Sequence, residues 1–303
     1  MRAAVLTSVD GAFELRDVPD PVGGEKVLVR VRAAGVNFAD VLVRRGRYPQ
    51  MPELPAVLGS EIAGELEDGT RVMAFTSGGG GYAEIAAVER AQVVPLPDGA
   101  TFAEGASFLL TFLTAYIPLT RQVRVRPGTT VLVYAGAGGV GTATIQVARS
   151  LGARVVAAVG SAEKLDVCRE LGAAEAYVYA DLPEDLRVDV VVDPVGGELF
   201  EQALGRMRPL GTLIAIGFAA GAWPEISPAN LVGRNVGVQG FYLGRLMRHE
   251  PALVAEAVGG VLQLWESGAV KPVVGAEFPL ADVERAHELV ESRKSTGKVV
   301  LLP

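Results

Sequence analysis

The segment from Val131 to Gly141 constrains the fold of this chain more than any other stretch. It reads VLVYAGAGGVG, so a run of β-favouring residues leads directly into a cluster of glycines. The next residues, Thr142 to Arg149, carry their apolar side chains at the spacing of one helix face. A strand, a tight glycine turn and a helix in this order form the opening of a dinucleotide-binding βαβ unit.

Three glycines in this segment, Gly136, Gly138 and Gly141, follow the G-x-G-x-x-G spacing. In that pattern the first glycine permits the sharp turn, the second lets the backbone approach a pyrophosphate, and the third lets the helix pack close to the strand. The N–H groups at the start of the helix then favour phosphate oxygens. We therefore expect a pyrophosphate to bind at five consecutive residues, which are Gly136, Ala137, Gly138, Gly139 and Val140.

Composition limits the remaining possibilities. A length of 303 residues suggests about two domains, and half of the residues are hydrophobic, so a large core can form. The net charge of −7, without a basic run, argues against a nucleic-acid-binding surface. The single cysteine, Cys168, excludes a disulfide framework and a cysteine-based zinc lobe, and we expect it to be a buried packing thiol.

No stretch of the sequence is expected to approach the length of a membrane span. The apolar run from Met1 to Leu6 is too short for a signal peptide, and we predict that it is a strand. These features predict a cytoplasmic protein that binds neither membranes nor nucleic acid.

The first hundred residues are predicted to be rich in strands, without a βαβ rhythm. Residues 26–32 alternate with a period of two, as a half-buried strand does, and residues 33–37 are expected to end that strand. A short helix is predicted at residues 38–45, and a long apolar helix at residues 102–120. Short strands bounded by glycine and proline are predicted at residues 61–66, 71–75 and 82–88.

A regular alternation of strands and helices begins at residue 131. Its Val, Ile and Ala runs are typical of strands buried on both faces of a parallel sheet. Six strands are predicted at residues 131–135, 154–159, 176–179, 188–193, 211–217 and 236–240. Helices are predicted at residues 139–151, 162–171, 199–206 and 243–266. The C-terminal strand, residues 298–302, is too small to stand alone, so we expect it to return to the first domain.

The end of the second predicted strand indicates the cofactor. An NAD-binding site usually has Asp or Glu there, about 20 residues after the glycines, to bind the ribose 2′-hydroxyl. Here Gly160 and Ser161 occupy the strand end, Lys164 follows, and Glu163 is close by. A small residue with a lysine suits a 2′-phosphate, which a carboxylate would repel. The sequence therefore favours NADP(H) over NAD(H); in the alternative, Ser161 caps the helix and Lys164 is a solvated charge.

Several separate motifs, in order along nearly the whole chain, resemble those of one family. The run from Leu132 to Arg149, with its GGVG, resembles the signature of quinone oxidoreductases, the ζ-crystallin branch of the medium-chain dehydrogenase/reductase superfamily. Further motifs that resemble those of the family are GVNFAD (35–40), RRGRYP (44–49), LGSEIAG (58–64), TAY (114–116), DPVGG (193–197), ESR (291–293) and GK (297–298).

The resemblance implies two domains and a pair of chains. It implies an α/β fold in which residues 108–246 form a doubly wound, six-stranded parallel Rossmann sheet that binds NADP(H). It also implies a β-rich, GroES-like catalytic domain made of residues 1–107 and completed by residues 247–303. The predicted edge strand at residues 236–239 is apolar, and in the family such edges join across a two-fold axis, so we expect a homodimer.

The resemblance further implies a site without zinc. Zinc-dependent relatives carry a cysteine at the position of Asn37 and a histidine at the position of Ser60, and neither residue here binds zinc tightly. The two histidines, His249 and His287, lie in predicted helical segments, and we expect them to be ordinary surface or core residues.

A reaction without a metal needs an acceptor that takes up hydride readily. We expect transfer from NADPH to a quinone or an α,β-unsaturated carbonyl, because a conjugated system delocalises the negative charge that develops. Of the catalytic candidates, Asn37 is expected to line the nicotinamide or the substrate oxygen, or else to be a turn residue before the helix. Asp40 can accept from a ribose or from Arg44. Tyr48 can contact substrate, relay a proton, or only pack before Pro49.

The resemblance implies further cofactor contacts, each with a structural alternative. Tyr179 is implied near the adenosine, or is a core aromatic at a strand end. Gly217 and Phe241 are implied near the nicotinamide, although Phe241 can equally be a core residue. Thr114 can bond the nicotinamide region or its own helix backbone. Arg293 can reach the 2′-phosphate or can be solvated.

Three functions remain open at this point. The first is an NADPH:quinone oxidoreductase, and the second is an NADPH-dependent reductase of enones or enoyl thioesters. An acyl-carrier substrate would need a basic surface, which Arg44, Arg45 and Arg47 leave open. The third function, from another class, is a non-catalytic protein that binds NADPH.

Overall fold

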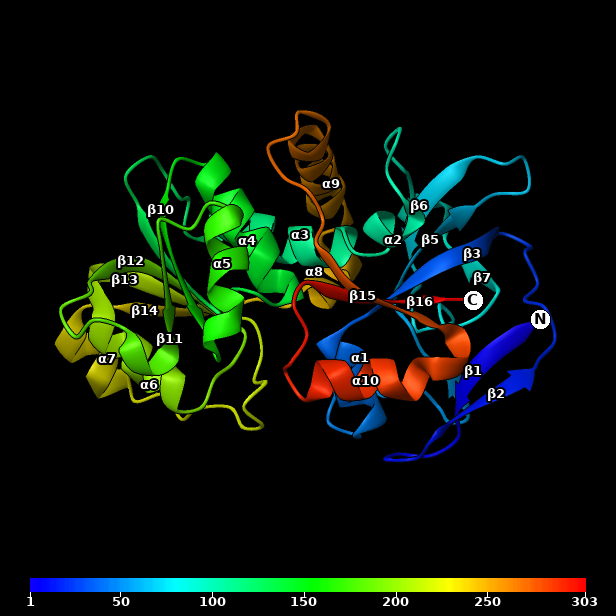
Figure 1. Cartoon of the computed structure of the whole chain (residues 1–303), viewed down its shortest axis with the longest axis horizontal. Coiled ribbons are helices and arrows are strands. Elements are labelled where there is room, and N and C mark those ends of the chain that lie inside the picture. Colours follow the sequence, from blue (N-terminus) through cyan, green and yellow to red (C-terminus); the bar gives the residue numbers. More distant parts are fainter. The chain divides into compact units, whose positions relative to one another are not determined.

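The structure is a computed structural model that describes residues 1–303. It divides into two compact units, of which the first comprises residues 1–109 and 272–303 and the second comprises residues 110–271. The chain therefore leaves the first unit, completes the second, and then returns to the first (Figure 1).

A single sheet of six parallel strands forms the centre of the second unit (Figure 1). Its spatial order is β11-β10-β9-β12-β13-β14, so the chain winds outward first in one direction and then in the other. This is the doubly wound order of a dinucleotide-binding fold, and the predicted Rossmann sheet is confirmed. The strands are β9 (Thr130–Tyr134), β10 (Arg154–Val159), β11 (Glu175–Val178), β12 (Val188–Asp193), β13 (Met207–Ala215) and β14 (Gly237–Gly240).

Helices cover this sheet because each parallel connection has to cross from one end of the sheet to the other. The strand order reverses between β9 and β12, so right-handed crossovers place α4 and α5 on one face and α6 on the other. Under α6, Phe200 and Leu204 pack against Leu132 and Val191 of the sheet. The helices are α3 (Leu109–Ile117), α4 (Gly139–Ser150), α5 (Leu165–Glu170), α6 (Glu198–Arg206), α7 (Pro228–Arg234), α8 (Leu243–His249) and α9 (Pro251–Glu266).

Two sheets form the first unit. The larger has seven strands in the order β15-β16-β3-β5-β6-β8, with β7 paired to β3, and the smaller has the order β2-β1-β4. The C-terminal strand β16 pairs with β3, as the red and blue ribbons of Figure 1 show. The predicted β-rich domain, completed by the C-terminal segment, is therefore confirmed. Its strands are β1 (Arg2–Leu6), β2 (Phe13–Asp17), β3 (Val27–Val36), β4 (Ala56–Val57), β5 (Glu61–Glu65), β6 (Arg71–Phe75), β7 (Ile85–Val88), β8 (Val93–Pro95), β15 (Val274–Pro279) and β16 (Lys298–Leu302); its helices are α1 (Phe38–Arg44), α2 (Phe102–Gly105) and α10 (Val283–Glu291).

Strand β3 is longer than predicted, because residues 33–36 continue it instead of ending it. The alternation of exposed and buried residues stops at Ala33, and the last four residues are all buried. In this part β3 lies between β5 and β16, so it has a hydrogen-bonded neighbour on both sides. The continued strand carries the chain directly to Asn37.

The apolar segment predicted as one helix at residues 102–120 is broken. It consists of α2, a turn, α3 and one π-helical turn at Pro118–Gln122. Residues Phe102–Gln122 have the length and composition of a possible membrane span, so the expectation that no stretch approaches one is wrong. However, 78% of the most apolar window is buried inside the structure, as is common for core helices of soluble proteins.

The helix predicted at residues 243–266 is also divided, because Pro251 starts a new helix after α8 ends at His249. Helix α9 belongs to the second unit, so the chain returns to the first unit at Pro272 and not at residue 247 as predicted. The reason is packing, since Gly260 of α9 lies against the Tyr116 ring and Glu256 pairs with Arg121.

Strand β14 lies at the outer edge of the parallel sheet, as the sequence predicts. Two large apolar side chains near this edge are mostly exposed, Leu210 at 89% and Val232 at 76%. Leu210 donates its N–H to the carbonyl of Asn235, directly before β14. Exposed apolar surface beside an unpaired edge agrees with pairing between two chains, and the homodimer stays a prediction.

Replacement of glycine by alanine should have opposite effects on stability at two positions, Gly275 in β15 and Gly259 in α9. A Cβ at Gly275 would overlap the carbonyl oxygen of Thr296, whereas a Cβ at Gly259 in α9 meets no atom within 4 Å. Gly275→Ala should lower the free energy of unfolding by about 2 kcal/mol through overpacking. Gly259→Ala should raise it by about 0.5–1 kcal/mol, because alanine favours the helix. Urea denaturation followed by circular dichroism measures both, and equal midpoints would contradict the strand pairing.

Candidate functional site

The glycine turn of the second unit has a backbone geometry that excludes most side chains. Gly138 is the N-cap of α4, and its N–H donates to the carbonyl oxygen of Ala135 at 2.8 Å. A Cβ at Gly141 would overlap that same oxygen, so the third glycine of the motif is required for helix and strand to approach. Ala135 itself has a φ of 50°, an uncommon left-handed conformation for a residue with a side chain.

The residues predicted to bind pyrophosphate lie together at the N-terminus of α4. Gly138, Gly139 and Val140 are half-buried, and Gly136 and Ala137 are buried beneath them. The first N–H groups of a helix have no acceptor within the helix, and the positive end of the helix dipole favours anions. The backbone present at this turn therefore fits a dinucleotide pyrophosphate.

The carboxyl ends of β9, β10 and β11 meet beside this turn. Tyr179 begins a short 3₁₀ turn after β11, and its hydroxyl accepts a hydrogen bond from the N–H of Ala135 at 3.2 Å. Its ring lies edge-on to that of Tyr134, with centroids 5.8 Å apart. A Cβ on Gly160 would lie only 3.8 Å from the Tyr179 ring. Tyr179 thus packs as a strand-end aromatic and also borders the glycine turn.

The loop after β10 carries charges of both signs. The Ser161 hydroxyl donates to Glu163 at 3.0 Å and makes no capping bond to the following helix. Lys164 is half-buried, and partial burial lowers its pKa while Glu163 raises it. A lysine and a carboxylate therefore lie on the same short 3₁₀ turn.

Other predicted cofactor residues lie on strand ends and on one helix of the second unit. Gly217 follows β13 and Phe241 follows β14, so both are at the carboxyl edge of the sheet. Phe241 is 6% exposed, and its N–H donates to Ala215 at 2.9 Å, which favours the packing alternative. Thr114 is buried within α3.

Two predicted residues of the first unit lie at or near its surface. Tyr48 is half-buried in the loop that follows α1. Arg293 is exposed after α10 and has a φ of 60°. Their contacts to substrate and to a 2′-phosphate stay predictions.

A buried polar cluster surrounds Asn37, at the point where β3 passes into α1. The Asn37 side-chain oxygen accepts a hydrogen bond from the Lys298 ammonium at 2.5 Å. The same ammonium pairs with Glu61 at 3.1 Å. Lys298 is 5% exposed and Glu61 is fully buried. Asn37 is therefore the N-cap residue before α1, and its side chain also meets a buried cation.

Asp40 binds the backbone of Asn37. Its carboxylate accepts from the N–H of Asn37 at 2.8 Å and from the hydroxyl of Tyr82 at 3.0 Å. The expected pairing with Arg44 is not found, because Arg44 turns the other way and pairs with Glu284 at 2.6 Å.

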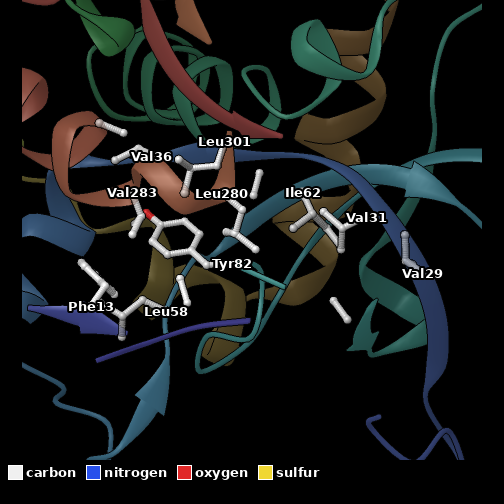
Figure 2. Close-up of a cluster of buried hydrophobic side chains, with 14 of the residues drawn as sticks. Phe13, Val29, Val31, Val36, Leu58, Ile62, Tyr82, Leu280, Val283 and Leu301 are labelled. Carbon is white, nitrogen blue, oxygen red and sulfur yellow. The ribbon is translucent and has the colours of Figure 1, made fainter. Parts of the chain in front are cut away.

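Tyr82 connects this cluster to helix α10. Figure 2 shows its ring among apolar side chains that include Leu58 and Val283. Its hydroxyl lies 3.3 Å from Nε2 of His287, which is fully buried on α10. The chain of contacts from Asn37 through Asp40 to Tyr82 and His287 thus crosses the core of the first unit.

Burial shifts the pKa values of the three titratable groups along this chain of contacts. Burial raises the pKa of Asp40 to about 6, although the hydrogen bond from Asn37 and the charge of Lys298 lower it. Burial also raises the pKa of Tyr82 well above its ordinary value. Burial, assisted by nearby arginines, lowers the pKa of His287 to about 3. At neutral pH His287 and Tyr82 are therefore uncharged, while Asp40 is ionised.

Comparison with known proteins shows which family has this arrangement. Residues 23–98 match the alcohol dehydrogenase GroES-like domain, and residues 139–258 match the zinc-binding dehydrogenase model. A quinone oxidoreductase-like protein 2 homolog of Nematostella vectensis is 36% identical over 302 residues, covering 92% of this chain and 82% of the relative. The chain belongs to the quinone oxidoreductases of the medium-chain dehydrogenase/reductase superfamily.

Solved structures of quinone oxidoreductases agree over the whole length. The quinone oxidoreductase of Thermus thermophilus, which was also solved in complex with NADPH, is 41% identical with a TM-score of 0.91, and the match covers 100% of both chains. A mycobacterial protein solved in complex with NADPH is 34% identical, also with a TM-score of 0.91 over 100% of both chains. The predicted family is confirmed.

The sequence predicts no role at the site for four residues that the structure brings to the cluster at Asn37, namely Lys298, Glu61, Tyr82 and His287. For two of them, the sequence contains a weak indication of a buried charge. Lys298 opens the otherwise apolar strand KVVLL, and Glu61 opens EIAGE. A charge at the start of a strand whose next residues are buried needs a partner, because an unpaired buried charge is costly.

The donor set at the Asn37 position of this chain does not fit a zinc ion. The oxygens of Asn37 and Glu61 are already bound by the Lys298 ammonium, which would repel a second cation. Asn37 and Ser60 also supply neither a thiolate nor an imidazole. No group of three or more His, Cys, Asp or Glu side chains that could hold a metal is found within residues 1–303.

The pKa values of His287 and Asp40 predict opposite pH effects on stability. The unfolded chain protonates His287 below its ordinary pKa of 6.5, but the folded chain does so only near pH 3. Acidification from pH 6.5 to 4 should therefore destabilise the fold through His287 by about 3 kcal/mol. The folded chain protonates Asp40 near pH 6, before the unfolded chain does, so the same acidification stabilises it through Asp40.

Two variants separate these opposing contributions. Relative to the parent, His287→Gln should gain stability as the pH falls from 6.5 to 4, and Asp40→Asn should lose stability over the same range. Urea denaturation at a series of pH values measures both differences. Parallel profiles for parent and His287→Gln would show that this imidazole is not buried in its neutral form.

Proposed function

We propose that this chain is an NADPH-dependent quinone oxidoreductase that transfers hydride without a metal ion. The proposal that no metal takes part is supported by one observation. The Lys298 ammonium donates hydrogen bonds to the oxygens of Asn37 and Glu61, where a catalytic cation would otherwise bind. Without a Lewis acid, an acceptor has to delocalise the negative charge itself, and a quinone does so.

The choice of NADPH rests on the second unit and on the related structures. The glycine turn and the N-terminus of α4 supply the pyrophosphate site. Lys164 and Ser161 follow β10, where NAD-specific sites have a carboxylate at the strand end. The Thermus thermophilus and mycobacterial neighbours were solved with NADPH, which supports the same cofactor here.

The residues of the first unit supply orientation and hydrogen bonding. NADPH, when bound, supplies the hydride. The Asn37 amide can donate to an oxygen on which negative charge develops, and such a preorganised donor lowers the barrier. Asp40 holds the Asn37 backbone through the bond at 2.8 Å, and Tyr82 in turn holds Asp40. The buried, neutral His287 supports Tyr82 from α10.

The reductase of enoyl thioesters is less well supported than a reductase of quinones or small enones. A phosphate-bearing acyl carrier would need free basic charges near the site. Arg44 pairs with Glu284, and Arg45 pairs with both Asp10 and Glu291. Two of the three arginines in this segment are therefore neutralised.

Cofactor preference can be tested by exchanging single charges near Ser161. Lys164→Ala should weaken NADPH binding about 10- to 100-fold and leave NADH binding nearly unchanged, because only NADPH has the 2′-phosphate. Glu163→Gln should strengthen NADPH binding selectively by removing a repulsive carboxylate. Fluorescence titration with each nucleotide measures the dissociation constants.

The matched control is Arg169→Ala, which removes one cation from α5, the helix that begins directly after Lys164. Arg169 is exposed and paired with Asp166, so its loss should not discriminate between the two nucleotides. Equal losses of NADPH and NADH binding in Lys164→Ala would contradict the assignment of the 2′-phosphate.

Acceptor preference can be tested by NADPH oxidation with three compounds in parallel. A benzoquinone should be reduced fastest, a small enone more slowly, and an enoyl-CoA slowest. A preference for the enoyl-CoA would favour the thioester reductase. NADPH binding without turnover of any acceptor would instead support the non-catalytic binding protein.

A further inference from the structure

Three segments that are distant in the sequence converge on the Lys298 ammonium. Lys298 opens β16, Glu61 opens β5, and Asn37 follows β3. The ammonium lies 2.5 Å from the amide oxygen of Asn37 and 3.1 Å from Glu61. All three side chains are buried, with exposures of 5%, 0% and 6%. This cluster is therefore a built interior feature and not a surface ion pair.

Space for the ammonium depends on Gly35. A Cβ at this position would lie 3.1 Å from the Lys298 nitrogen and 3.0 Å from the Glu61 carboxylate. It would also overlap the carbonyl oxygen of Ala106. A glycine two residues before Asn37 thus lets the charged groups reach the end of β3.

The lysine determines which way the Asn37 amide is turned. An ammonium has only donors, so the atom that it contacts at 2.5 Å must be the amide oxygen. The amide nitrogen then lies on the opposite side, where it is 3.5 Å from the carbonyl oxygen of Gly35. That contact is long and uses at most one of the two N–H groups. The other N–H is available to an acceptor atom of a ligand.

The geometry points to Lys298 as a positioning residue for the proposed hydride transfer. Its ammonium, balanced by Glu61, holds the Asn37 amide so that an N–H donates to the oxygen of the quinone as that oxygen gains negative charge. Lys298 itself touches no ligand and exchanges no proton. This role rests on the proposed function, because it assumes that the oxygen of a conjugated acceptor binds at Asn37.

The test removes both charges and keeps the volume. In the double variant Lys298→Met/Glu61→Met no buried charge is left unpaired, so loss of folding by an isolated charge is avoided. The kcat for a benzoquinone should fall about 10- to 100-fold, because the donor acts mainly in the transition state. The Kd for NADPH should change by less than about threefold, since Lys298 contacts no cofactor.

The matched control removes another ion pair of the same sheet. Arg32 of β3 pairs with Glu65 of β5 at 2.7 Å on the surface. The double variant Arg32→Met/Glu65→Met should keep the parental kcat. An equal fall of kcat in both double variants would overturn the positioning role, because it would reflect a general effect of losing a charge pair on these strands.

A spectroscopic readout tests the orientation of the amide directly. The chain has three asparagines, Asn37, Asn230 and Asn235, so ¹⁵N-asparagine labelling yields three side-chain NH₂ signals. In the parent, the Asn37 signal should be protected from solvent exchange and shifted from the other two. In Lys298→Met/Glu61→Met it should move and lose protection, while the signals of Asn230 and Asn235 stay in place.

This readout keeps the two proposals distinguishable. If the parent reduces no quinone, the proposed function fails, and the Asn37 signal still reports whether Lys298 orients the amide. An Asn37 signal in the parent that exchanges as fast as those of Asn230 and Asn235 overturns the orientation, even if the double variant does not fold. A fall in kcat with an unchanged Asn37 signal overturns it as well.

Discussion

The buried contact of Lys298 with Glu61 and Asn37 is the interaction on which the rest of the first unit depends. Removing two charges from water costs several kcal/mol for each ion, and their attraction offsets this only when the geometry is good. A chain that buries such a pair therefore has little freedom in how β3, β5 and β16 are aligned. A shift of β16 by one residue would turn Lys298 to the other face of the sheet and take it away from Glu61. The C-terminal return of the chain is in this way coupled to the geometry at Asn37.

Asn37 is held from two sides, and the two contacts have different chemical consequences. The lysine binds the side-chain oxygen and so determines which group of the amide can face a ligand. Asp40 binds the backbone N–H and keeps the junction of β3 and α1 in place. An amide held in this way can donate one or two hydrogen bonds, which is far weaker than the polarisation by a metal ion. The residues at this position therefore match an acceptor that is already activated by conjugation better than a simple alcohol or ketone.

The sequence predicted those parts of the structure that depend on local pattern. The glycine turn from Gly136 to Gly141 and the six parallel strands can be predicted from the sequence, because each is determined by a residue pattern within about ten residues. The pairing of Lys298 with Asn37 joins residues 261 positions apart, and no local pattern shows it. The same limit explains the predicted pairing of Asp40 with Arg44, because helical spacing allows it but Glu284 offers Arg44 a partner from α10. The prediction that β3 ends at Ala33 was wrong because the loss of alternation was read as an end, whereas it marks burial of both faces.

The proposed preference for NADPH depends on a few charges on one turn of the second unit. The Ser161 hydroxyl donates to Glu163, so the carboxylate lies beside the strand end even though the strand itself ends in Gly160 and Ser161. A 2′-phosphate arriving there gains from Lys164 and loses from Glu163, and both effects are weakened by solvent because the turn is partly exposed. Under the proposed function, cofactor preference in this turn would arise from the difference between two opposite charges, and neither charge alone would determine it.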